Sequence, residues 1–435
     1  MLKEYILPYG KDQKSLFVPE ENVIAYGGPK DAPAIDVALQ VRNALEEPIN
    51  MQPLADCIPE NGKVVVIVDD YTRPTPASEI LPSLIDYLNQ KGIPDKDISI
   101  LIAAGIHRSM TKAELLEKIG EQIYQRIEIH QHDGSDKAQM AFCGETSKGT
   151  PVWLNRHAAE ADFRIGIGLV EAHAYAGFSG GPKIMMPGIA AKETIFHHHG
   201  NLAVSDRSRF GVTDGNPFWE DLVEVAQIGK LDFIVNIVLN RDGEIAFLHA
   251  GEPVETQRAS IEQFMTVYGV EVPEPADLVI ASANPKYWYF DQSNVAMLNA
   301  ANVVKDGGIR IIAAECPENF GPDIIRRLYL ESFGRENWLS DETYLQELKD
   351  GKYDYELADA PAIYKLIKAE KCAHMIFVSC KLDPKDAETT HTDLRNNLQA
   401  AVDDALQQLG PGAKIAILPF GSMSLPYLSQ SANEE

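Results

Sequence analysis

Cysteine and positive charge are both scarce in this chain of 435 residues. Its 39 lysines and arginines are outnumbered by 64 aspartates and glutamates, which gives a net charge of −25. General nucleic-acid binding depends on Lys and Arg that neutralise phosphates, so this balance argues against nucleic acid as a partner. It also excludes a polybasic membrane anchor. The net charge of the protein does not determine the charge of its ligand, because a local site can have an electrostatic potential of the opposite sign.

The few cysteines and the absence of long apolar runs favour a cytoplasmic protein. An odd number of cysteines without Cys-x-x-Cys spacing predicts free thiols, most of them buried as small apolar residues. They are Cys57, Cys143, Cys316, Cys372 and Cys380. No apolar run approaches the roughly 18 residues of a transmembrane helix, so we expect no membrane partner. The N-terminal segment also lacks the basic and apolar regions of a signal peptide.

Short β-branched runs alternate with helical patterns, which predicts α/β architecture with parallel or mixed sheets. In the first half we expect strands at 63–70, 97–105, 164–170 and 232–240. Helical spacing of apolar residues predicts helices at 77–92 and 110–120. In the second half we expect strands at 278–284, 309–315, 375–379 and 414–420.

Two α/β domains, 1–272 and 273–435, with an active-site cleft between them are the expected organisation. Pro273 and Pro275 flank a stretch that is typical of a linker. The charged segment 326–351 is expected to be largely helical. The sequence leaves open whether the last segment packs back on the first domain.

Four segments that follow predicted strands carry residues suited to chemistry, and ligand sites of open α/β sheets gather at such positions. The first segment, Asp-Asp-Tyr-Thr-Arg-Pro-Thr-Pro, runs from Asp69 to Pro76. The hydroxyls of Thr72 and Thr75, the Arg73 guanidinium and a helix N-terminus are groups that can hold a phosphate. Asp70 can orient Arg73 or bind a ribose hydroxyl. An ordinary polar turn with capping residues is the alternative interpretation.

Histidines and a lysine mark the second and third segments. His107 follows the strand at 97–105, where an imidazole can serve as acid or base near neutral pH. In the third segment, His173 and Lys183 lie ten residues apart around a glycine-rich loop. Such a lysine can act as a phosphate-binding cation or as a nucleophile with a lowered pKa. Structural turns with a backbone-bonded histidine and a solvated lysine are the alternatives.

The fourth segment ends in three consecutive histidines, His197, His198 and His199. Three successive residues of a helix point in different directions, so one metal ligand is more plausible here than a three-histidine zinc site. A solvated surface stretch is the alternative. The motifs His-Glu-x-x-His and Gly-x-Gly-x-x-Gly, typical of zinc proteases and dinucleotide-binding proteins, are absent.

In their order along the chain, these segments resemble the nickel-dependent lactate racemase superfamily of 2-hydroxyacid racemases and epimerases. The resemblance covers most of residues 23–200 and is weaker in the C-terminal half, where it rests mainly on VVKDGGIRIIAAE. It is carried by VRNALEEPINMQPLADCI, DDYTRPTP, KGIPDKDISILIAAGIHRSMT, GETSKGTPVWLN and EAHAYAGFSGGPKIMMPGIAAKETIFHHH.

The resemblance implies a nickel-pincer nucleotide as cofactor, a pyridinium-3-thioamide-5-thiocarboxylic acid mononucleotide. It implies that Lys183 is covalently linked to this group and that His199 is the protein ligand to nickel. Asp70, Thr72, Arg73 and Thr75 would hold the phosphate and ribose. Cofactor-biosynthesis proteins are then implied partners. Imidazole and soft sulfur donors suit square-planar nickel.

The resemblance also implies a reaction, the inversion of C2 of a small-molecule 2-hydroxy acid. Hydride passes reversibly to the cofactor, a 2-keto acid forms, and His107 and His173 serve as acid and base on opposite faces. The oligomeric state is not indicated. Two alternatives are an NAD-dependent 2-hydroxyacid dehydrogenase and a non-catalytic carboxylate-binding homologue.

The chain departs from the family pattern on the substrate side. The family's second domain carries a Tyr-Gln-x-x-Lys-like run, whereas here no lysine lies between Lys286 and Lys305. Substrate contacts are instead expected among three residues of the comparable stretch, Gln292, Ser293 and Asn294. The threonines that usually flank the first catalytic histidine are Ala104 and Ile106. These differences favour a 2-hydroxy acid other than lactate.

Overall fold

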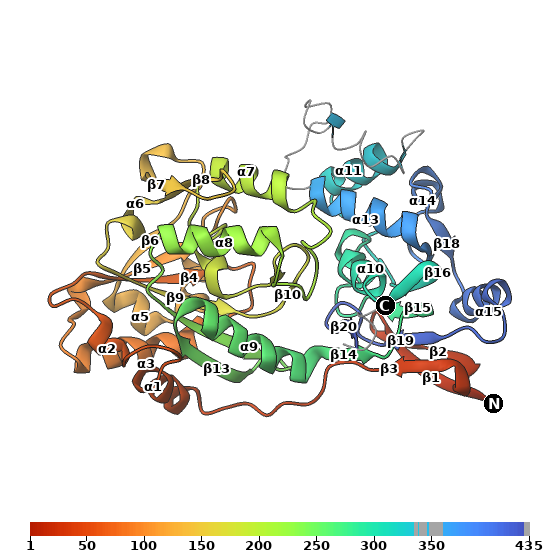
Figure 1. The fold of residues 1–435 in the computed structure, drawn as a ribbon, viewed down its shortest axis with the longest axis horizontal. Coiled ribbons are helices and arrows are strands. Elements are labelled where there is room, and N and C mark those ends of the chain that lie inside the picture. Colours follow the sequence, from red (N-terminus) through yellow and green to blue (C-terminus); the bar gives the residue numbers. More distant parts are fainter. Residues whose placement is uncertain (335–337, 339–345, 348–359, 430–435) are drawn as a thin grey trace. The chain divides into compact units, whose positions relative to one another are not determined.

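The computed structural model describes residues 1–334, 338, 346–347 and 360–429. These residues form two compact units, each with its own six-stranded sheet (Figure 1). Residues 31–267 make one unit, here called the N-terminal unit. Residues 1–30 join 268–435 in the other, the C-terminal unit. The predicted α/β class with two parallel or mixed sheets is confirmed.

The sheet of the N-terminal unit has the strand order β13-β12-β9-β4-β5-β6. Neighbouring strands are parallel except β12 and β13, which form an antiparallel pair. The bounds are β4 Val64–Asp69, β5 Ile98–Ala103, β6 Glu128–Gln131, β9 Phe163–Leu169, β12 Phe233–Leu239 and β13 Ile245–Gly251. All four strands expected in this half are present, with β6 and β13 added at the edges.

Helices cover both faces of this sheet, which is why its central strands are largely apolar (Figure 1). On one face pack α1 (Val37–Glu46), α2 (Leu54–Cys57), α3 (Ala77–Gln90), α4 (Lys112–Ile119) and α5 (Glu121–Arg126). On the other face lie α7 (Lys192–Leu202) and α8 (Pro217–Ile228). A capping box between Thr111 and Glu114 fixes the start of α4.

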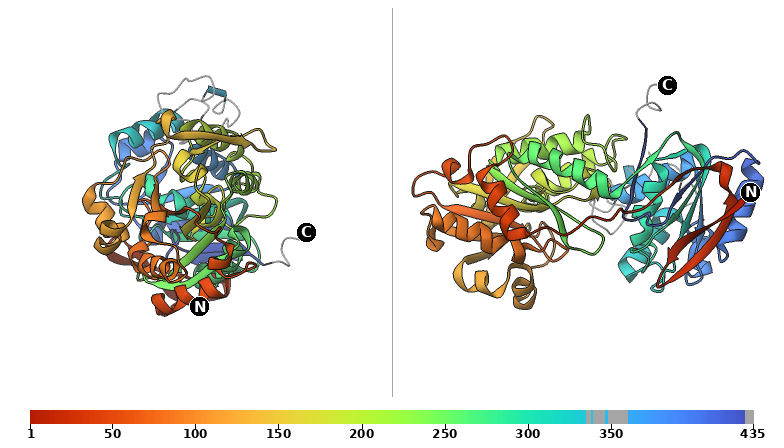
Figure 2. Two further views of the ribbon diagram at one scale, coloured as in Figure 1. Left: turned by 90° about the vertical axis from the view of Figure 1, so that its left-hand side faces the viewer. Right: turned by 90° about the horizontal axis from the view of Figure 1, so that it is seen from below.

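The sheet of the C-terminal unit is parallel throughout, in the order β18-β17-β16-β15-β19-β3. Its strands are β3 Val23–Tyr26, β15 Ala276–Ser282, β16 Val304–Ala313, β17 His374–Val378, β18 Asp393–Arg395 and β19 Ile415–Leu418. The hairpin of β1 (Leu2–Tyr9) and β2 (Asp12–Pro19) packs on one face together with α15 (Leu398–Leu409) (Figure 2). Helices α10 (Asn294–Ala301) and α13 (Ala360–Cys372) contact β16.

Smaller elements connect these layers. In the N-terminal unit they are β7 (Met140–Glu145), β8 (Pro151–Asn155), α6 (Arg156–Ala159), β10 (Ala172–His173), β11 (Gly177–Phe178) and α9 (Pro253–Tyr268), the last of which reaches the boundary. In the C-terminal unit they are β14 (Gly269–Val272), α11 (Asp323–Phe333), α14 (Pro384–Thr389) and β20 (Leu425–Leu428). Single 3-10 turns are η1 (Glu20–Asn22), η2 (Asp95–Asp97), η3 (Lys137–Gln139), η4 (Gly181–Ile184) and η5 (Asp291–Ser293).

The two units differ from the expected division 1–272 and 273–435 at the start of the chain and at the internal boundary. The first thirty residues belong to the C-terminal unit, because β3 pairs with β19 and completes that sheet. Residues 269–272 form strand β14, which pairs with β20 near the end of the chain. The last segment therefore packs within the C-terminal unit. Of the expected helical segment 326–351, the structure describes the first part as α11, and most of the rest lies outside the described residues.

The five cysteines are free thiols, as expected, but the prediction that most are buried is wrong. Cys316 is buried, Cys57 and Cys143 are half-buried, and Cys372 and Cys380 are exposed. The exposed pair lies where α13 and β17 end, at positions that the sheets and helices do not cover. Within the described residues, no helix combines the length and the apolar character needed to cross a membrane.

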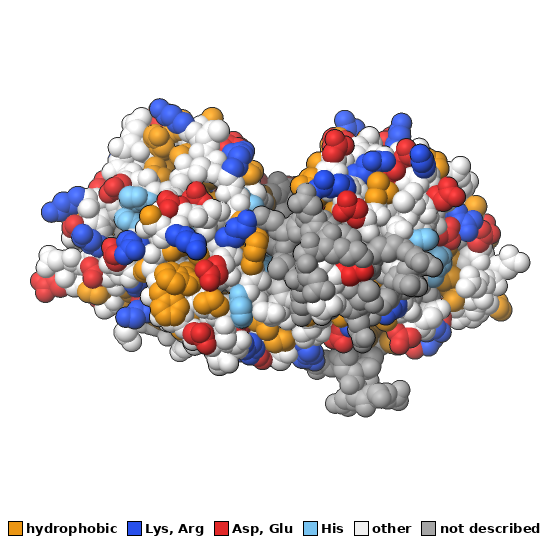
Figure 3. All heavy atoms as spheres, turned by 90° about the horizontal axis from the view of Figure 1, so that it is seen from above, with side chains coloured by type: hydrophobic (Ala, Val, Ile, Leu, Met, Phe, Trp, Pro, Cys, Tyr) orange, Lys and Arg blue, Asp and Glu red, His pale blue; other side chains and the backbone are white. Residues whose placement is uncertain are grey.

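The excess of acidic residues is not gathered into a patch on the face drawn in Figure 3. On the described surface of that face, Lys and Arg side chains are interspersed with Asp and Glu.

We expect Leu7→Ala to loosen the C-terminal unit alone, because Leu7 is fully buried against the sheet that contains β15 and β16. Truncation of a buried leucine costs about 2–5 kcal/mol of unfolding free energy. Hydrogen exchange should therefore accelerate in β15 and β16 but not in β4 and β5. Leu2→Ala on the same hairpin, at a position that is 66% exposed, is the matched control. Equal acceleration in both sheets would contradict the assignment of this hairpin.

Candidate active site

The strands β5, β4 and β9 are parallel neighbours in the sheet of the N-terminal unit, so their carboxyl ends lie side by side. Most candidate residues of this unit lie in the segments that follow these ends. From β4 the chain continues on one side to β5, whereas β9 lies on the other side. This reversal makes the carboxyl ends of β4 and β9 a topological switch point, the usual ligand position of an open α/β sheet. The segments that start at Asp70, Ala104 and Val170 leave the sheet there.

A buried ion pair fixes the segment that follows β4. The Lys118 ammonium lies 2.6 Å from Asp69 Oδ1 and donates to the Arg73 carbonyl oxygen at 2.8 Å. The Thr75 hydroxyl donates to the other oxygen of Asp69. Burial raises the pKa of Asp69, and Lys118 opposes this shift. The turn is therefore held from beneath by α4, the helix that carries Lys118.

Asp70 faces away from this pair and toward His107. Its Oδ2 atom lies 2.8 Å from His107 Nδ1, and its Oδ1 atom accepts hydrogen bonds from the Thr72 backbone N–H at 3.1 Å and the Thr72 hydroxyl at 2.6 Å. Burial opposes ionisation of Asp70, but the hydrogen bonds from His107 and Thr72 outweigh it and lower the pKa. An ionised carboxylate thus contacts the imidazole.

His173 and Lys183 form the second contact of the site. His173 Nε2 lies 2.9 Å from Lys183 Nζ, while its Nδ1 accepts hydrogen bonds from the backbone N–H groups of Tyr175 and Ala176. The proton of a neutral His173 ring therefore lies on Nε2 and points at the lysine nitrogen. Burial, with a smaller contribution from Arg73, lowers the pKa of Lys183 well below its ordinary value. A neutral amine is the form that accepts this proton.

The glycine-rich loop before Lys183 is held by buried polar side chains from two other elements. Gly180 and Gly181 have φ of +73° and +52°, conformations that favour glycine. A Cβ atom on Gly181 would lie 2.7 Å from Gln257 Cδ. Gln257 donates to the Ser179 and Gly180 carbonyl oxygens, and Asn236 accepts from the Gly181 backbone N–H. These hydrogen bonds fix the backbone position of the loop from which Lys183 extends.

His199, on α7, presents one ring nitrogen for coordination. Its Nδ1–H donates to the Ile195 carbonyl oxygen at 3.1 Å, which leaves the lone pair on Nε2. Burial and the nearby Lys183 lower the pKa of His199 to about 3. A neutral imidazole with its other N–H bound to a carbonyl is the usual form of a histidine metal ligand.

Aromatic rings connect His199 to His173. The Phe218 ring at the start of α8 lies 4.9 Å from His199 and 6.4 Å from His173, between ring centroids. Tyr175 lies 6.3 Å from His199 and 5.6 Å from Phe218. His198 is turned away, because its Nε2 donates to the Phe218 carbonyl oxygen. A site built from His197, His198 and His199 together is therefore not formed, and the described residues hold no group of three or more metal-ligating side chains.

Comparison with known proteins matches this arrangement to one family. The family model described as the lactate racemase N-terminal domain matches residues 9–211. A lactate racemase of Lactiplantibacillus plantarum is 30% identical over 424 residues, covering 95% of this chain and 97% of that protein. A lactate racemase of Thermoanaerobacterium thermosaccharolyticum is 32% identical over 333 residues, 75% of this chain and 78% of that protein. The chain belongs to the lactate racemase family.

Solved structures agree with the fold of this lactate racemase family member. The lactate racemase apoprotein from Thermoanaerobacterium thermosaccharolyticum superimposes with a TM-score of 0.84 at 28% identity, covering 98% of this chain and all of that chain. A Thermotoga maritima protein gives a TM-score of 0.63 at 19% identity over 91% of this chain and supports the fold alone.

The structure divides the predicted site residues of this family member between its two units. Eight lie in the N-terminal unit: Asp70, Thr72, Arg73, Thr75, His107, His173, Lys183 and His199. The other three belong to the C-terminal unit, at η5 and the start of α10. Of these, Ser293 is fully buried and donates to the Tyr289 carbonyl oxygen, whereas Gln292 and Asn294 are half-buried. A substrate contact from Ser293 would require its hydroxyl to leave that partner.

Three residues that position the site carry no recognisable motif in the sequence. Lys118 is one of several charged residues in α4, and only the structure shows that its ammonium is buried. Asn236 and Gln257 lie in a strand and a helix far along the chain from the loop that they hold. For these three residues the sequence gives one signal: Asn236 is a polar residue inside the otherwise apolar strand β12.

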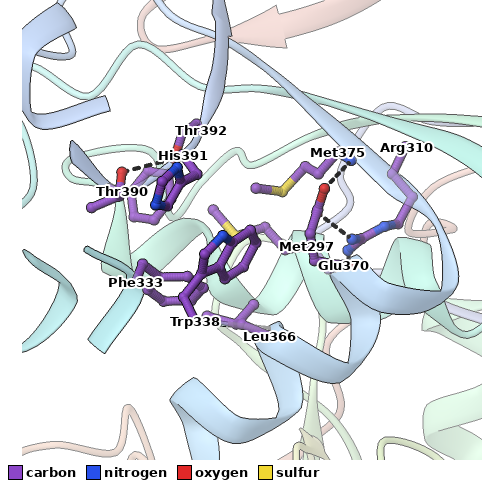
Figure 4. Close-up of a pocket in the computed structure, with 11 residues that line it drawn as sticks. Met297, Arg310, Phe333, Trp338, Leu366, Glu370, Met375, Thr390, His391 and Thr392 are labelled. Carbon is purple, nitrogen blue, oxygen red and sulfur yellow. Dashed lines mark hydrogen bonds and ion pairs between the residues drawn. The ribbon is translucent and has the colours of Figure 1, made fainter. Parts of the chain in front are cut away.

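A pocket in the C-terminal unit has a different character (Figure 4). Its lining is largely apolar, with Met297, Phe333, Trp338 and Leu366. The Arg310 guanidinium at this pocket already pairs with Glu370 at 3.1 Å and donates to the Ala373 carbonyl oxygen. This pocket therefore lacks an uncompensated charge for an anionic ligand.

Lys118→Met should destabilise the protein, because it leaves the buried Asp69 carboxylate without its cation. Removal of one partner of a buried ion pair costs about 3–5 kcal/mol. Since burial raises the pKa of Asp69, this cost should shrink as the pH falls and the carboxyl is protonated. Urea unfolding measures the loss, and Asp69→Asn in the same chain should recover part of it. Lys112→Met, on the exposed side of α4, should change stability by less than about 0.5 kcal/mol.

The lowered pKa of Lys183 predicts unusual reactivity toward a small acylating reagent. Amines react as the neutral form, which is present above the pKa, so Lys183 should be acetylated at pH 7–8, where ordinary lysines are almost wholly protonated. Competitive labelling with acetic anhydride and peptide mass spectrometry measures the rates. Lys137, which is exposed, and Lys118, which pairs with Asp69, are the controls. A rate for Lys183 that rises between pH 8 and pH 10 as steeply as that of Lys137 would contradict a neutral amine, whatever the access of the reagent.

Proposed function

We propose that this protein is a racemase or epimerase that inverts C2 of a 2-hydroxy acid with a nickel-pincer nucleotide. The observation that carries the proposal is that two histidines follow the carboxyl ends of β5 and β9, the strands on either side of β4, with opposite proton positions. His107 faces a carboxylate through Nδ1, whereas His173 accepts backbone hydrogen bonds at Nδ1 and faces Lys183 through Nε2. Family membership independently supports the reaction class.

The donor groups of the N-terminal unit fit the proposed cofactor. Lys183 provides an amine that burial keeps neutral, as a covalent linkage to a thiocarbonyl group requires. His199 provides an Nε2 lone pair for nickel. Arg73 donates to the Thr72 carbonyl oxygen and forms no ion pair with a carboxylate among the described residues, which leaves guanidinium N–H groups for a phosphate. The Thr75 hydroxyl is already engaged by Asp69, so its contribution would come through the turn that it stabilises.

When bound, the nickel-pincer group supplies a reversible acceptor for the C2 hydride. The protein supplies the proton transfers and the orientation. His107 is proposed to take or return the hydroxyl proton at Nε2 on one face of the substrate. His173 is its proposed counterpart on the other face, and to take a proton at Nε2 its ring must carry the other proton on Nδ1, which requires Nδ1 to give up its contacts with the Tyr175 and Ala176 N–H groups. Each imidazole is oriented by its Nδ1 contact, so only Nε2 faces outward from these contacts. The 2-keto acid formed between the two transfers must present both faces to these groups.

For the substrate, we propose a 2-hydroxy acid other than lactate. The residues that flank the His107 turn are Ala104, which is buried, and Ile106, which is 37% exposed. An exposed isoleucine in place of a hydroxyl-bearing residue offers apolar contact without a hydrogen bond. Gln292 and Asn294 are the proposed neutral contacts for substrate oxygens in the C-terminal unit.

The decisive experiment follows the loss of optical purity of a panel of chiral 2-hydroxy acids. The protein is produced together with the proteins that make the cofactor, and we expect nickel at about one equivalent with inversion of at least one acid. Lys183→Ala should abolish inversion and retained nickel, while Lys137→Ala, at an exposed position, should preserve both. Reduction of NAD by the same acids would support a dehydrogenase instead. Binding of an acid by nickel-loaded protein without turnover would support a non-catalytic homologue.

A further inference from the structure

The Asp70 carboxylate is fully engaged by the protein itself. The residue is only 2% exposed, and each of its oxygens has a partner. One oxygen faces His107 Nδ1 at 2.8 Å, and the other accepts from the backbone N–H and the hydroxyl of Thr72. A ribose hydroxyl or a phosphate would have to displace one of these contacts to reach the carboxylate.

We propose that Asp70 is a positioning residue that holds the proton of His107 on Nδ1 and so leaves the Nε2 lone pair to act as the base. This role differs from the nucleotide contact that the sequence suggests, and it rests on the proposed function of His107. An ionised carboxylate has no proton to donate, so the imidazole nitrogen that it contacts must be the N–H donor. Carboxylates orient catalytic histidines in this way in other enzymes.

The turn that carries His107 is built to keep this contact. The His107 backbone N–H donates to the Ala104 carbonyl oxygen at 2.8 Å. Gly105 donates to the Gly188 carbonyl oxygen and accepts from the Gly134 backbone N–H, which ties the turn to the segment that follows Lys183. The side chain of His107 is 46% exposed, so its far edge can be reached by a substrate.

Two of the other charged groups near this contact, Arg108 and Lys118, are already paired. The Arg108 guanidinium forms two hydrogen bonds to Glu114 and lies 4.2 Å from the centre of the Tyr71 ring. Lys118 is engaged by Asp69. His107 therefore has one carboxylate neighbour that sets its ring orientation.

Thr72 makes the replacement Asp70→Asn especially informative. Both Thr72 donors point at Oδ1, so the amide oxygen of the substituted side chain would stay with them and its NH₂ group would face His107 Nδ1. Since NH₂ only donates, Nδ1 would have to accept, and the proton of the neutral ring would move to Nε2. The substitution therefore inverts the tautomer while changing few atoms.

The test reads this tautomer directly, by ¹⁵N NMR of the full-length protein labelled at histidine, at a pH where the ring is neutral. His107→Gln identifies the signal. We expect an N–H at Nδ1 and a bare Nε2 in the parent protein, and the reverse in Asp70→Asn. A proton on Nε2 in the parent protein would overturn the proposal without any variant having to fold.

Activity and cofactor content then separate positioning from nucleotide binding. In cofactor-loaded protein, Asp70→Asn should lower kcat at least about 100-fold, the scale of a lost general base, with nickel content unchanged. Asp86→Asn, the same charge change at a half-exposed position on α3, should leave kcat within about twofold. Loss of nickel and nucleotide in parallel with activity would overturn the proposal in favour of a cofactor contact. Failure of the parent protein to invert any hydroxy acid would sink the proposed function, whereas the tautomer result would still stand.

Discussion

Parallel pairing of β4 with both β5 and β9 is the constraint on which the site depends. It places three carboxyl ends side by side, so three segments widely separated in the chain leave the sheet together. Both faces of this sheet are covered, which accounts for the largely apolar side chains of its central strands. The chemistry then lies in the turns, while the strands supply a fixed platform.

Burial does more than hold the platform, because it selects the protonation states of the site. Lys183 and His199 both have lowered pKa values, with burial as the largest cause. Neutral nitrogen donors are what the proposed covalent link and the proposed nickel ligand need. Asp70 shows the opposite outcome, since hydrogen bonds from His107 and Thr72 overcome burial and keep it ionised. Groups of the same unit are thus held in different charge states by their local partners.

The sequence predicts the strands and the residues at their ends well, because periodicity and chain order are local information. All eight expected strands are present, and the helix at Ala77 starts where expected. The role of Lys118 could not be predicted, because burial of its ammonium depends on how α4 packs against the turn after β4. The pairing of β3 with β19 could not be predicted either, because it joins residues near opposite ends of the chain. The sequence marks both Asp70 and His107 as candidate site residues, but only the fold shows that they contact each other.

The proposed inversion of one carbon needs the same proton transfer on two opposite faces, yet the two histidines proposed for it have different surroundings. His107 is half-exposed and contacts a carboxylate, whereas His173 is anchored by backbone N–H groups and contacts an amine. Chemical symmetry in the reaction therefore does not require symmetry in the protein. In both environments Nδ1 makes the contact that orients the ring, so Nε2 lies on the side of the ring away from that contact. The equilibrium constant fixes only the ratio of kcat/KM in the two directions. The two histidines can therefore have different surroundings, and kcat and KM can each differ between the directions, without changing the equilibrium of a reversible inversion.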